Sequence, residues 1–346
     1  MLKKLFAKKP LHQVLLAGSG EEFAVGRGKT VLESALEAGL AYPHDCTVGT
    51  CGSCRSRLLS GKVDAITPFG YTLSREELEA GYILACQAVP ESDLEIAVDL
   101  GAAAAVRTTA RLVESRALTH DIRAVTWHTD APVHYRAGQY MNVEWPGGPG
   151  PRSYSFSAAP RPGGQTALTT FIRKVPGGAF TERLFGEDMA AVPFTIEAPH
   201  GGFWLRKGEG PIVLIGGGSG LSPLLSLLED AANRGVRRDA VLLFGARTPR
   251  DLYCQDEIAA LAGRWAGRFD FRPVLSEEPA PGLRSGLVTA EIADALAWLG
   301  GTADLQAYLC GPPGMIDAGI AALIAAGVSL PEIHYDKFTD ASSRPA

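Results

Sequence analysis

The chain has 346 residues, a length that predicts two or three domains. A formal net charge of -5, with 46% hydrophobic and 21% charged residues, is typical of a soluble globular protein. This balance gives no reason to expect nucleic-acid binding, which usually requires a basic surface. No apolar run is long enough to span a bilayer, because glycines interrupt the longest candidate, residues 211–228.

The first ten residues contain four lysines and three apolar side chains at helical spacing. One interpretation of this segment, residues 1–10, is a frayed and solvated tail. The other is contact with an anionic membrane surface, to which each lysine near the lipid contributes about 1 kcal/mol. Lys8, Lys9 and Pro10 interrupt any secretory hydrophobic region, so we expect a cytoplasmic protein. The inner face of the cytoplasmic membrane is the alternative location.

Residues 11–100 predict a compact α+β unit. Two strands are expected between 11 and 25, a capping box at Thr30 begins a helix over 31–40, and a second capping box at Ser74 begins a short helix. Acidic residues outnumber basic ones 13 to 6 between Pro10 and Leu100. This excess suits docking to a basic partner surface, although an ordinary solvated face has the same composition.

Four cysteines of this unit have the spacing of an iron–sulfur site. They are Cys46, Cys51, Cys54 and Cys86. Three in the pattern C-x4-C-x2-C with a distant fourth are typical of a plant-type [2Fe-2S] ferredoxin. Zinc sites more often show two short cysteine pairs, and disulfides require an export context. Gly49 and Gly52 allow a tight loop with inward-facing N–H groups, so we predict a [2Fe-2S] cluster here.

Two further domains are expected after a small-residue linker, residues 101–105. Closely spaced strands and turns over 106–209, with one helix over 179–185, predict an antiparallel β-barrel. Strands and helices alternate over 210–346, which predicts a doubly wound parallel sheet. The fold class is therefore multidomain, with an α+β unit, a β-barrel and an α/β domain.

Glycine-rich turns mark two candidate phosphate sites. After the apolar strand 211–215, a turn with Gly217, Gly218 and Gly220 leads into a helix. Backbone N–H groups and a helix N-terminus meet there, as a pyrophosphate requires, whereas simple tight packing is the alternative. A second such backbone, residues 176–181, begins the barrel helix.

Two short motifs complete the candidate site. Arg152, Tyr154 and Ser155 offer a guanidinium for a phosphate, an aromatic face for a ring and a hydroxyl for a ring nitrogen. Cys310 ends an apolar strand at the edge of the sheet where ligands bind. It is either a buried small hydrophobe or part of a nicotinamide pocket, which its Gly-Pro-Pro turn favours. No paired histidine supports a nucleophilic role.

Together these stretches resemble the ferredoxin–NAD(P)+ reductase-type electron-transfer components of bacterial oxygenases, most of all those of xylene monooxygenases. The resemblance covers residues 11–338. The stretches that carry it are 43–54, 152–157, 173–178, 244–247 and 251–254.

The resemblance implies roles for individual residues. FAD would be held by Arg152, Tyr154, Ser155 and Arg173, with Gly177, Gly178 and Thr181 on its pyrophosphate. NADH would be bound by Gly217, Gly218, Gly220 and Cys310. The aromatic Phe338 would cover the flavin, and with Cys310 and Ser155 it would lie beside the reacting atoms. Eight residues follow Phe338, unlike in relatives that end at this aromatic.

The implied activity is that of an NADH-dependent oxidoreductase. Electrons would pass from NADH to FAD, then to the [2Fe-2S] cluster, and on to a hydroxylase component of a hydrocarbon or aromatic monooxygenase. We expect a monomer whose partner is a membrane-bound di-iron hydroxylase. A soluble ring dioxygenase or phenol-type monooxygenase is the alternative partner, and a redox-sensing protein is disfavoured by the complete flavin and nicotinamide apparatus. Arg247 and Arg250 could meet a 2′-phosphate, so the preference for NADH rests on the resemblance.

Overall fold

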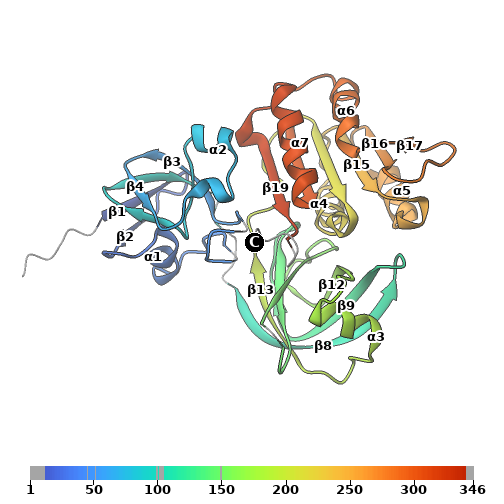
Figure 1. Ribbon diagram of the computed structural model, residues 1–346, viewed down its shortest axis with the longest axis horizontal. Coiled ribbons are helices and arrows are strands. Elements are labelled where there is room, and N and C mark those ends of the chain that lie inside the picture. The colour runs from blue at the N-terminus through green and yellow to red at the C-terminus, as the bar shows by residue number, and fades with distance from the viewer. Residues whose placement is uncertain are drawn as a thin grey trace, which may run out of the picture. The chain divides into compact units, whose positions relative to one another are not determined.

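The computed structural model describes residues 12–44, 46–50, 52–98, 100, 105–148 and 150–339 (Figure 1). The expected basic segment, most of the expected linker, the ligand candidate Cys51 and the chain from residue 340 lie outside the described residues. Two compact units are present, one with residues up to 104 together with 200–202, the other with 105–199 and 203 onward. Each of the three domain ranges predicted from the sequence contains one of the three large sheets. The exact boundaries of these domains stay predictions.

The N-terminal unit is built on a mixed five-stranded sheet in the order β2-β1-β7-β3-β5, beside a β4-β6 ribbon. Its strands are β1 (His12–Ala17), β2 (Glu22–Val25), β3 (Arg55–Ser60), β4 (Val63–Ala65), β5 (Tyr82–Leu84), β6 (Ala88–Pro90) and β7 (Leu94–Ala97). Its helices are α1 (Val31–Glu37), η1 (Phe69–Tyr71) and α2 (Arg75–Glu79). The cluster loop lies between α1 and β3, so the sheet and α1 fix both of its ends.

Both capping boxes are confirmed. Thr30 accepts from the backbone N–H of Glu33 at the start of α1, and Ser74 accepts from that of Glu77 at the start of α2. The predicted extension of α1 to Leu40 is wrong, because the helix ends at Glu37. Gly39 adopts a φ of +78°, which is the left-handed conformation that terminates helices.

The second sheet is antiparallel and has the order β11-β10-β13-β8-β9-β12. Its elements are β8 (Val106–Ala117), β9 (Ile122–Val133), β10 (Tyr140–Glu144), β11 (Arg152–Ser155), β12 (Gln165–Arg173), α3 (Ala179–Gly186) and β13 (Phe194–His200). An isolated bridge between Phe156, which follows β11, and Thr170 of β12 links the two edges of the sheet, as expected for the predicted barrel. Inside it, the buried ring of Trp127 lies 4.9 Å from that of Phe194 in an edge-on contact.

The third sheet is parallel, in the order β17-β16-β15-β14-β18-β19, as predicted for a doubly wound domain. Its strands are β14 (Ile212–Gly217), β15 (Ala240–Ala246), β16 (Phe269–Leu275), β17 (Arg284–Ser285), β18 (Gln306–Gly311) and β19 (Ile333–Lys337). Its helices are η2 (Gly218–Gly220), α4 (Leu221–Asn233), η3 (Pro249–Asp251), α5 (Gln255–Arg264), η4 (Val288–Glu291), α6 (Ile292–Trp298), α7 (Pro313–Ala325) and η5 (Leu330–Glu332).

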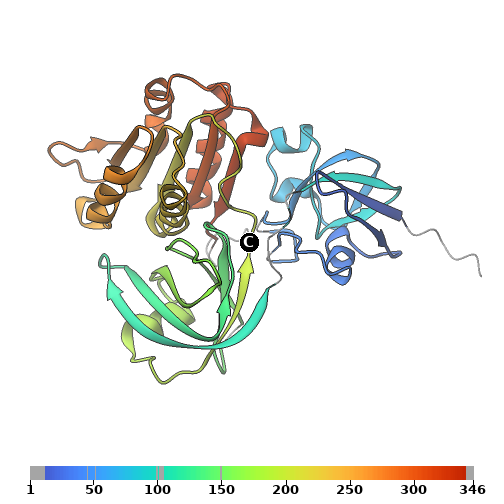
Figure 2. The same ribbon diagram turned by 180° about the vertical axis from the view of Figure 1, so that it is seen from behind.

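Helices cover both faces of this sheet. Side chains of α4 and α5 join one hydrophobic core, and those of α6 and α7 join the other. Figures 1 and 2 show the arrangement of these helices around the sheet. Every residue of β14 is buried, which explains its uninterrupted apolar sequence. Among the described residues, no helix has the length and apolarity that a membrane crossing requires.

Candidate functional site

Three of the four predicted cluster ligands meet within the N-terminal unit. The side chains of Cys54 and Cys86 are buried and that of Cys46 is half-buried. The backbone N–H of Thr50 donates to Cys46 Sγ at 3.2 Å, and that of Cys86 donates to Cys54 Sγ at 3.5 Å. Such N–H···S bonds stabilise thiolates and tune the potential of an iron–sulfur cluster.

The pKa values of these thiols are shifted by their hydrogen bonds to one another. A hydrogen bond from Cys86 lowers the pKa of Cys54, whereas bonds to Cys46 and Cys54 raise the pKa of Cys86, which keeps the shared proton. Three thiols that compete for protons in one partly buried place form a donor set that suits iron, since the metal replaces those protons. The described part of the predicted ligand set therefore fits the cluster, and Cys51 lies outside it.

The glycines of the cluster loop have the conformations that were predicted for them. Gly49 and Gly52 have φ values of +84° and +79°. A Cβ on Gly49 would lie 2.7 Å from Cγ of Gln87, whose amide also donates to Thr47 O at 3.3 Å. The Thr72 hydroxyl donates to Gly49 O, so segments on both sides hold the loop in shape.

The flavin candidates on β11 differ in their surroundings. Arg152 is exposed and donates to Pro151 O at 2.9 Å. The half-buried ring of Tyr154 packs against Phe180 at 5.6 Å, and burial raises the pKa of its hydroxyl well above 10, so it stays a donor. Ser155 is buried, and its carbonyl accepts from the hydroxyl of Ser222 at 2.9 Å.

The loop before α3 is shaped by its own threonine. Thr181 Oγ1 accepts from Val175 N at 3.0 Å and donates to Val175 O at 3.2 Å. Gly177 has a φ of +71°, and a Cβ on Gly178, the N-cap of α3, would lie 2.8 Å from Thr181 Oγ1. The two glycines are therefore required by the loop itself, and the loop leads into a helix N-terminus.

The glycine turn after β14 packs directly on the end of β18. A Cβ on Gly220 would lie 2.2 Å from the carbonyl oxygen of Cys310, and one on Gly217 would lie 2.7 Å from Sδ of Met315. Gly218 has a φ of +55°. Burial raises the pKa of the Cys310 thiol well above its ordinary value, so it is neutral at physiological pH and does not act as a thiolate.

Helix α4 connects the glycine turn to the barrel through three polar side chains that sequence reasoning missed. Ser226 Oγ donates to Ala158 O at 2.6 Å, and Glu229 accepts from Ala159 N at 2.7 Å. Ser222 donates to Ser155 as described above. Polar residues at i, i+4 and i+7 on a mostly apolar helix were the available signal, because they share one face.

The structure brings several predicted residues of the two reductase domains together. Arg173, at the end of β12, lies with Nη1 3.6 Å from the position a Cβ on Gly218 would take, and its Nε donates to Asp121 at 3.1 Å. The half-buried Phe338 donates its N–H to Gly311 O at 2.9 Å, directly after Cys310. Barrel residues and the glycine turn after β14 therefore share one region of the C-terminal unit.

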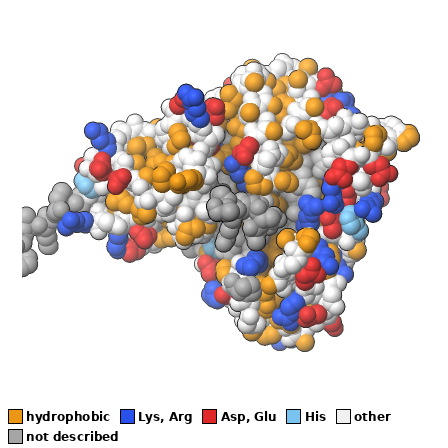
Figure 3. Space-filling view, viewed as in Figure 1, with side chains coloured by type: hydrophobic (Ala, Val, Ile, Leu, Met, Phe, Trp, Pro, Cys, Tyr) orange, Lys and Arg blue, Asp and Glu red, His pale blue; other side chains and the backbone are white. Residues whose placement is uncertain are grey.

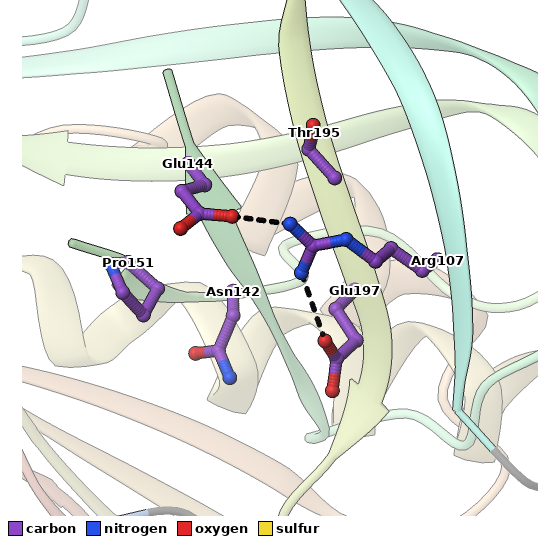
Figure 4. Close-up of a pocket in the computed structure, with 6 residues that line it drawn as sticks. All are labelled: Arg107, Asn142, Glu144, Pro151, Thr195 and Glu197. Atoms are coloured by element: carbon purple, nitrogen blue, oxygen red, sulfur yellow. Dashed lines mark hydrogen bonds and ion pairs between the residues drawn. The ribbon is translucent and has the colours of Figure 1, made fainter. Parts of the chain in front are cut away.

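A separate small pocket lies on the barrel. Figure 4 shows Arg107 of β8 between Glu144 and Glu197, and the guanidinium lies 3.3 Å from the latter. The cavity measures about 70 Å³. Binding sites for drug-sized ligands usually measure about 300 Å³ or more, so this pocket does not accommodate a flavin or a dinucleotide.

A cysteine loop for iron, a barrel with a flavin motif and a doubly wound domain with a glycine turn define an iron–sulfur flavoprotein that oxidises a nicotinamide nucleotide. Family models match an N-terminal and a C-terminal part of the chain. Residues 14–91 match the 2Fe-2S iron-sulfur cluster binding domain, and residues 214–319 match the oxidoreductase NAD-binding domain.

Relatives cover nearly the whole chain. The xylene/toluene monooxygenase electron transfer component of Pseudomonas putida is 41% identical over 96% of this chain and 95% of its own. The aromatic O-demethylase reductase subunit of an Amycolatopsis strain is 36% identical over 91% of this chain and 95% of its own. Among solved structures, a cytochrome P450 reductase from Amycolatopsis has a TM-score of 0.72 at 33% identity, covering 95% of this chain and 99% of that one.

The chain belongs to the family of ferredoxin–NAD(P)+ reductase-type electron-transfer components of oxygenases. It is an NADH-dependent oxidoreductase with a [2Fe-2S] cluster and FAD, and it passes electrons to an oxygenase component. The predicted family, fold, cofactors and reaction are confirmed.

Proposed function

We propose that this reductase serves the hydroxylase of a multicomponent hydrocarbon or aromatic monooxygenase, and that this hydroxylase is a membrane-bound di-iron protein. The observation that carries the proposal is the end-to-end match, at 41% identity, with a xylene/toluene monooxygenase component. On this view the reductase is a monomer in the cytoplasm that works at the inner face of the membrane, where the basic segment 1–10 contacts anionic lipid.

The site residues are assigned to the cofactors as part of this proposal. Cys46, Cys51, Cys54 and Cys86 hold the cluster. Arg152, Tyr154, Ser155, Arg173, Gly177, Gly178 and Thr181 hold FAD, whereas Gly217, Gly218, Gly220 and Cys310 bind NADH. FAD held there would supply the chemistry that links hydride transfer from NADH to single-electron transfer to the cluster.

The protein's own residues position these groups. Ser155 and the neutral thiol of Cys310 are both buried and add no charge to the proposed site. The exposed guanidinium of Arg152 would offer its donors to a phosphate, and the half-buried Phe338 would cover the flavin ring.

An apolar face beside the cluster loop supports docking of a protein partner. Val48 is 60% exposed, Ile66 62% and Tyr71 78%. The N–H of Ile66 donates to Gln87 O at 2.9 Å, and Gln87 in turn bonds the cluster loop. Tyr71 directly precedes Thr72, which also bonds that loop. Figure 3 shows hydrophobic side chains on the visible face of this unit. Such a patch is typical of an interaction surface.

The electron path is tested by replacing one ligand. Cys86→Ser should abolish NADH-driven reduction of cytochrome c and bleach the cluster absorbance, while ferricyanide reduction by the flavin persists. Cys254→Ser is the control, because Cys254 caps α5 outside the cluster. Equal loss of both activities in Cys86→Ser would contradict the assigned order of carriers.

The partner is tested by reconstitution. Candidate membrane hydroxylases and soluble oxygenase components are each mixed with the purified reductase and NADH, and product formation is measured. A soluble partner is the second candidate, because a carbazole 1,9a-dioxygenase reductase has a TM-score of 0.67 at 29% identity. Tyr71→Ala should slow only the partner reaction, and Leu287→Ala, at an exposed apolar site of the C-terminal unit, should not. Coupling to soluble components alone would overturn the membrane assignment.

A further inference from the structure

The sequence places an arginine where a doubly wound fold distinguishes the two nicotinamide coenzymes. Arg247 directly follows β15, the strand next to β14, at the carboxyl-terminal edge of the parallel sheet. In such folds an acidic residue beyond the glycine turn bonds the ribose 2′-hydroxyl of NAD, whereas an arginine accommodates the 2′-phosphate of NADP. On that rule alone, Arg247 would favour NADPH.

The structure shows that this guanidinium is already engaged. Arg247 Nη2 lies 3.0 Å from Asp121 Oδ2 and 3.0 Å from Asp251 Oδ1. Asp251 comes from η3 of the same domain, but Asp121 comes from the turn between β8 and β9 of the barrel. A 2′-phosphate would have to compete with two carboxylates for one guanidinium, and displacing a partner leaves a partly buried charge uncompensated.

Both carboxylates are fixed by other donors, so they do not swing away freely. Asp251 also accepts from Thr248 N at 3.0 Å, and Asp121 also accepts from Arg173 Nε at 3.1 Å. Burial alone would raise the pKa of Asp251, but hydrogen bonds from Arg247 and Thr248 outweigh burial and lower it. The carboxylates are therefore ionised at neutral pH.

The neighbouring loop adds negative charge at the same edge. The N–H groups of Glu277 and Glu278, which follow β16, donate to the carbonyl of Arg247 at 2.9 and 3.2 Å. Both glutamate side chains are exposed. An arriving 2′-phosphate would thus meet the two carboxylates that bind Arg247, at an edge whose negative charge Glu277 and Glu278 increase, whereas a 2′-hydroxyl meets acceptors.

We propose that Asp121 and Asp251 set the preference for NADH by holding Arg247 away from the coenzyme's 2′ position. Coenzyme selectivity is then a property of two domains, because one of the two restraining carboxylates belongs to the flavin barrel. Asp121 and Asp251 are positioning residues that act through Arg247. This inference rests on the NADH-dependent activity assigned above.

The test measures binding of adenosine fragments to the flavin- and cluster-loaded protein by calorimetry. In Asp121→Asn, the affinity for 2′,5′-ADP should rise about tenfold or more, the gain expected for one charge-assisted hydrogen bond. The affinity for 5′-AMP should stay within about twofold, since that fragment lacks the 2′-phosphate. The kcat/KM ratio of NADPH to NADH should rise in parallel.

Two further variants separate this role from a structural one. Asp239→Asn removes a carboxylate that also pairs with an arginine, Arg268, but at the opposite end of β15, and should leave both affinities unchanged. Adding Arg247→Ala to Asp121→Asn should abolish the gain for 2′,5′-ADP. A gain that persists without Arg247, or equal shifts for both fragments, would overturn the proposal. Absence of NADH oxidation by the unmodified protein would instead refute the assigned activity.

Discussion

Replacing Gly220 by alanine tests whether the glycine turn is as tightly packed as the structure indicates. The added Cβ would lie 2.2 Å from the carbonyl oxygen and 2.5 Å from the carbonyl carbon of Cys310, and 2.8 Å from Gly311 N. All three atoms are backbone, so no side chain can rotate to relieve the clash. Ordinary contact requires a displacement of roughly 1 Å between the turn and β18.

We expect that displacement to lower both the stability of the protein and its affinity for NADH. β14 and β18 are paired, with Gly216 opposite Cys310, so separating them strains the ladder next to the turn. Overpacking of this kind costs about 1–3 kcal/mol and occasionally more, and a clash with backbone belongs at the upper end. Because the turn would also move relative to the pyrophosphate, we expect NADH affinity to fall together with stability.

Urea unfolding followed by circular dichroism measures the first effect, and NADH titration measures the second. Gly263→Ala is the matched control, because Gly263 lies exposed in α5 with no atom within 4 Å of the added Cβ. That substitution should stabilise the protein by about 0.5–1 kcal/mol, as alanine does in a helix. A Gly220→Ala variant that is as stable as the parent and binds NADH normally would refute the reasoning.

Three further predictions concern the flavin motif, α4 and alkaline pH. Arg152→Ala should lose FAD during gel filtration without loss of stability, which the flavin-to-protein absorbance ratio measures. Arg111→Ala, at an exposed site on β8, is the control. Equal flavin content in the two variants would contradict the phosphate role of Arg152. Ser222→Ala should cost about 1–3 kcal/mol in urea unfolding, because its hydroxyl bonds buried backbone at Ser155 and Phe171, and a neutral effect would exclude this anchoring role. Burial raises the pKa of several tyrosines, so their contribution to the unfolding free energy should be constant below pH 10, where they ionise in the unfolded chain, and should fall above it by about 1.4 kcal/mol per pH unit for each tyrosine. For Tyr308 the fall should extend to its folded pKa of about 12, and a urea midpoint unchanged between pH 9 and 11 would contradict this. The tyrosines are Tyr42, Tyr135, Tyr154, Tyr253 and Tyr308.

Local chemistry was readable from the sequence because its signals lie within a few residues. The cysteine spacing and the capping box at Thr30 need only neighbours along the chain, and the structure shows the box. The end of α1 was missed, because leucine periodicity was extended past Gly39.

Long-range pairs were beyond a single sequence. Asp121 and Arg247 lie 126 positions apart, and Ser222 bonds Ser155 across 67 positions. Neither residue of such a pair carries a local sequence signal that identifies its partner. Only the packing of the barrel against the parallel sheet brings these pairs together. Considered alone, an arginine after β15 favours NADPH.

Helix α4 also bears on how this enzyme can be recombined with its relatives. A chimera cut between barrel and nucleotide domain, near residue 210, would place Ser226 and Glu229 from one parent against residues 158–159 from another. Those contacts run from side chains to backbone, so the incoming barrel may differ in sequence there as long as its main chain follows the same path. Functional crossovers should therefore depend on the backbone of this short segment more than on overall identity.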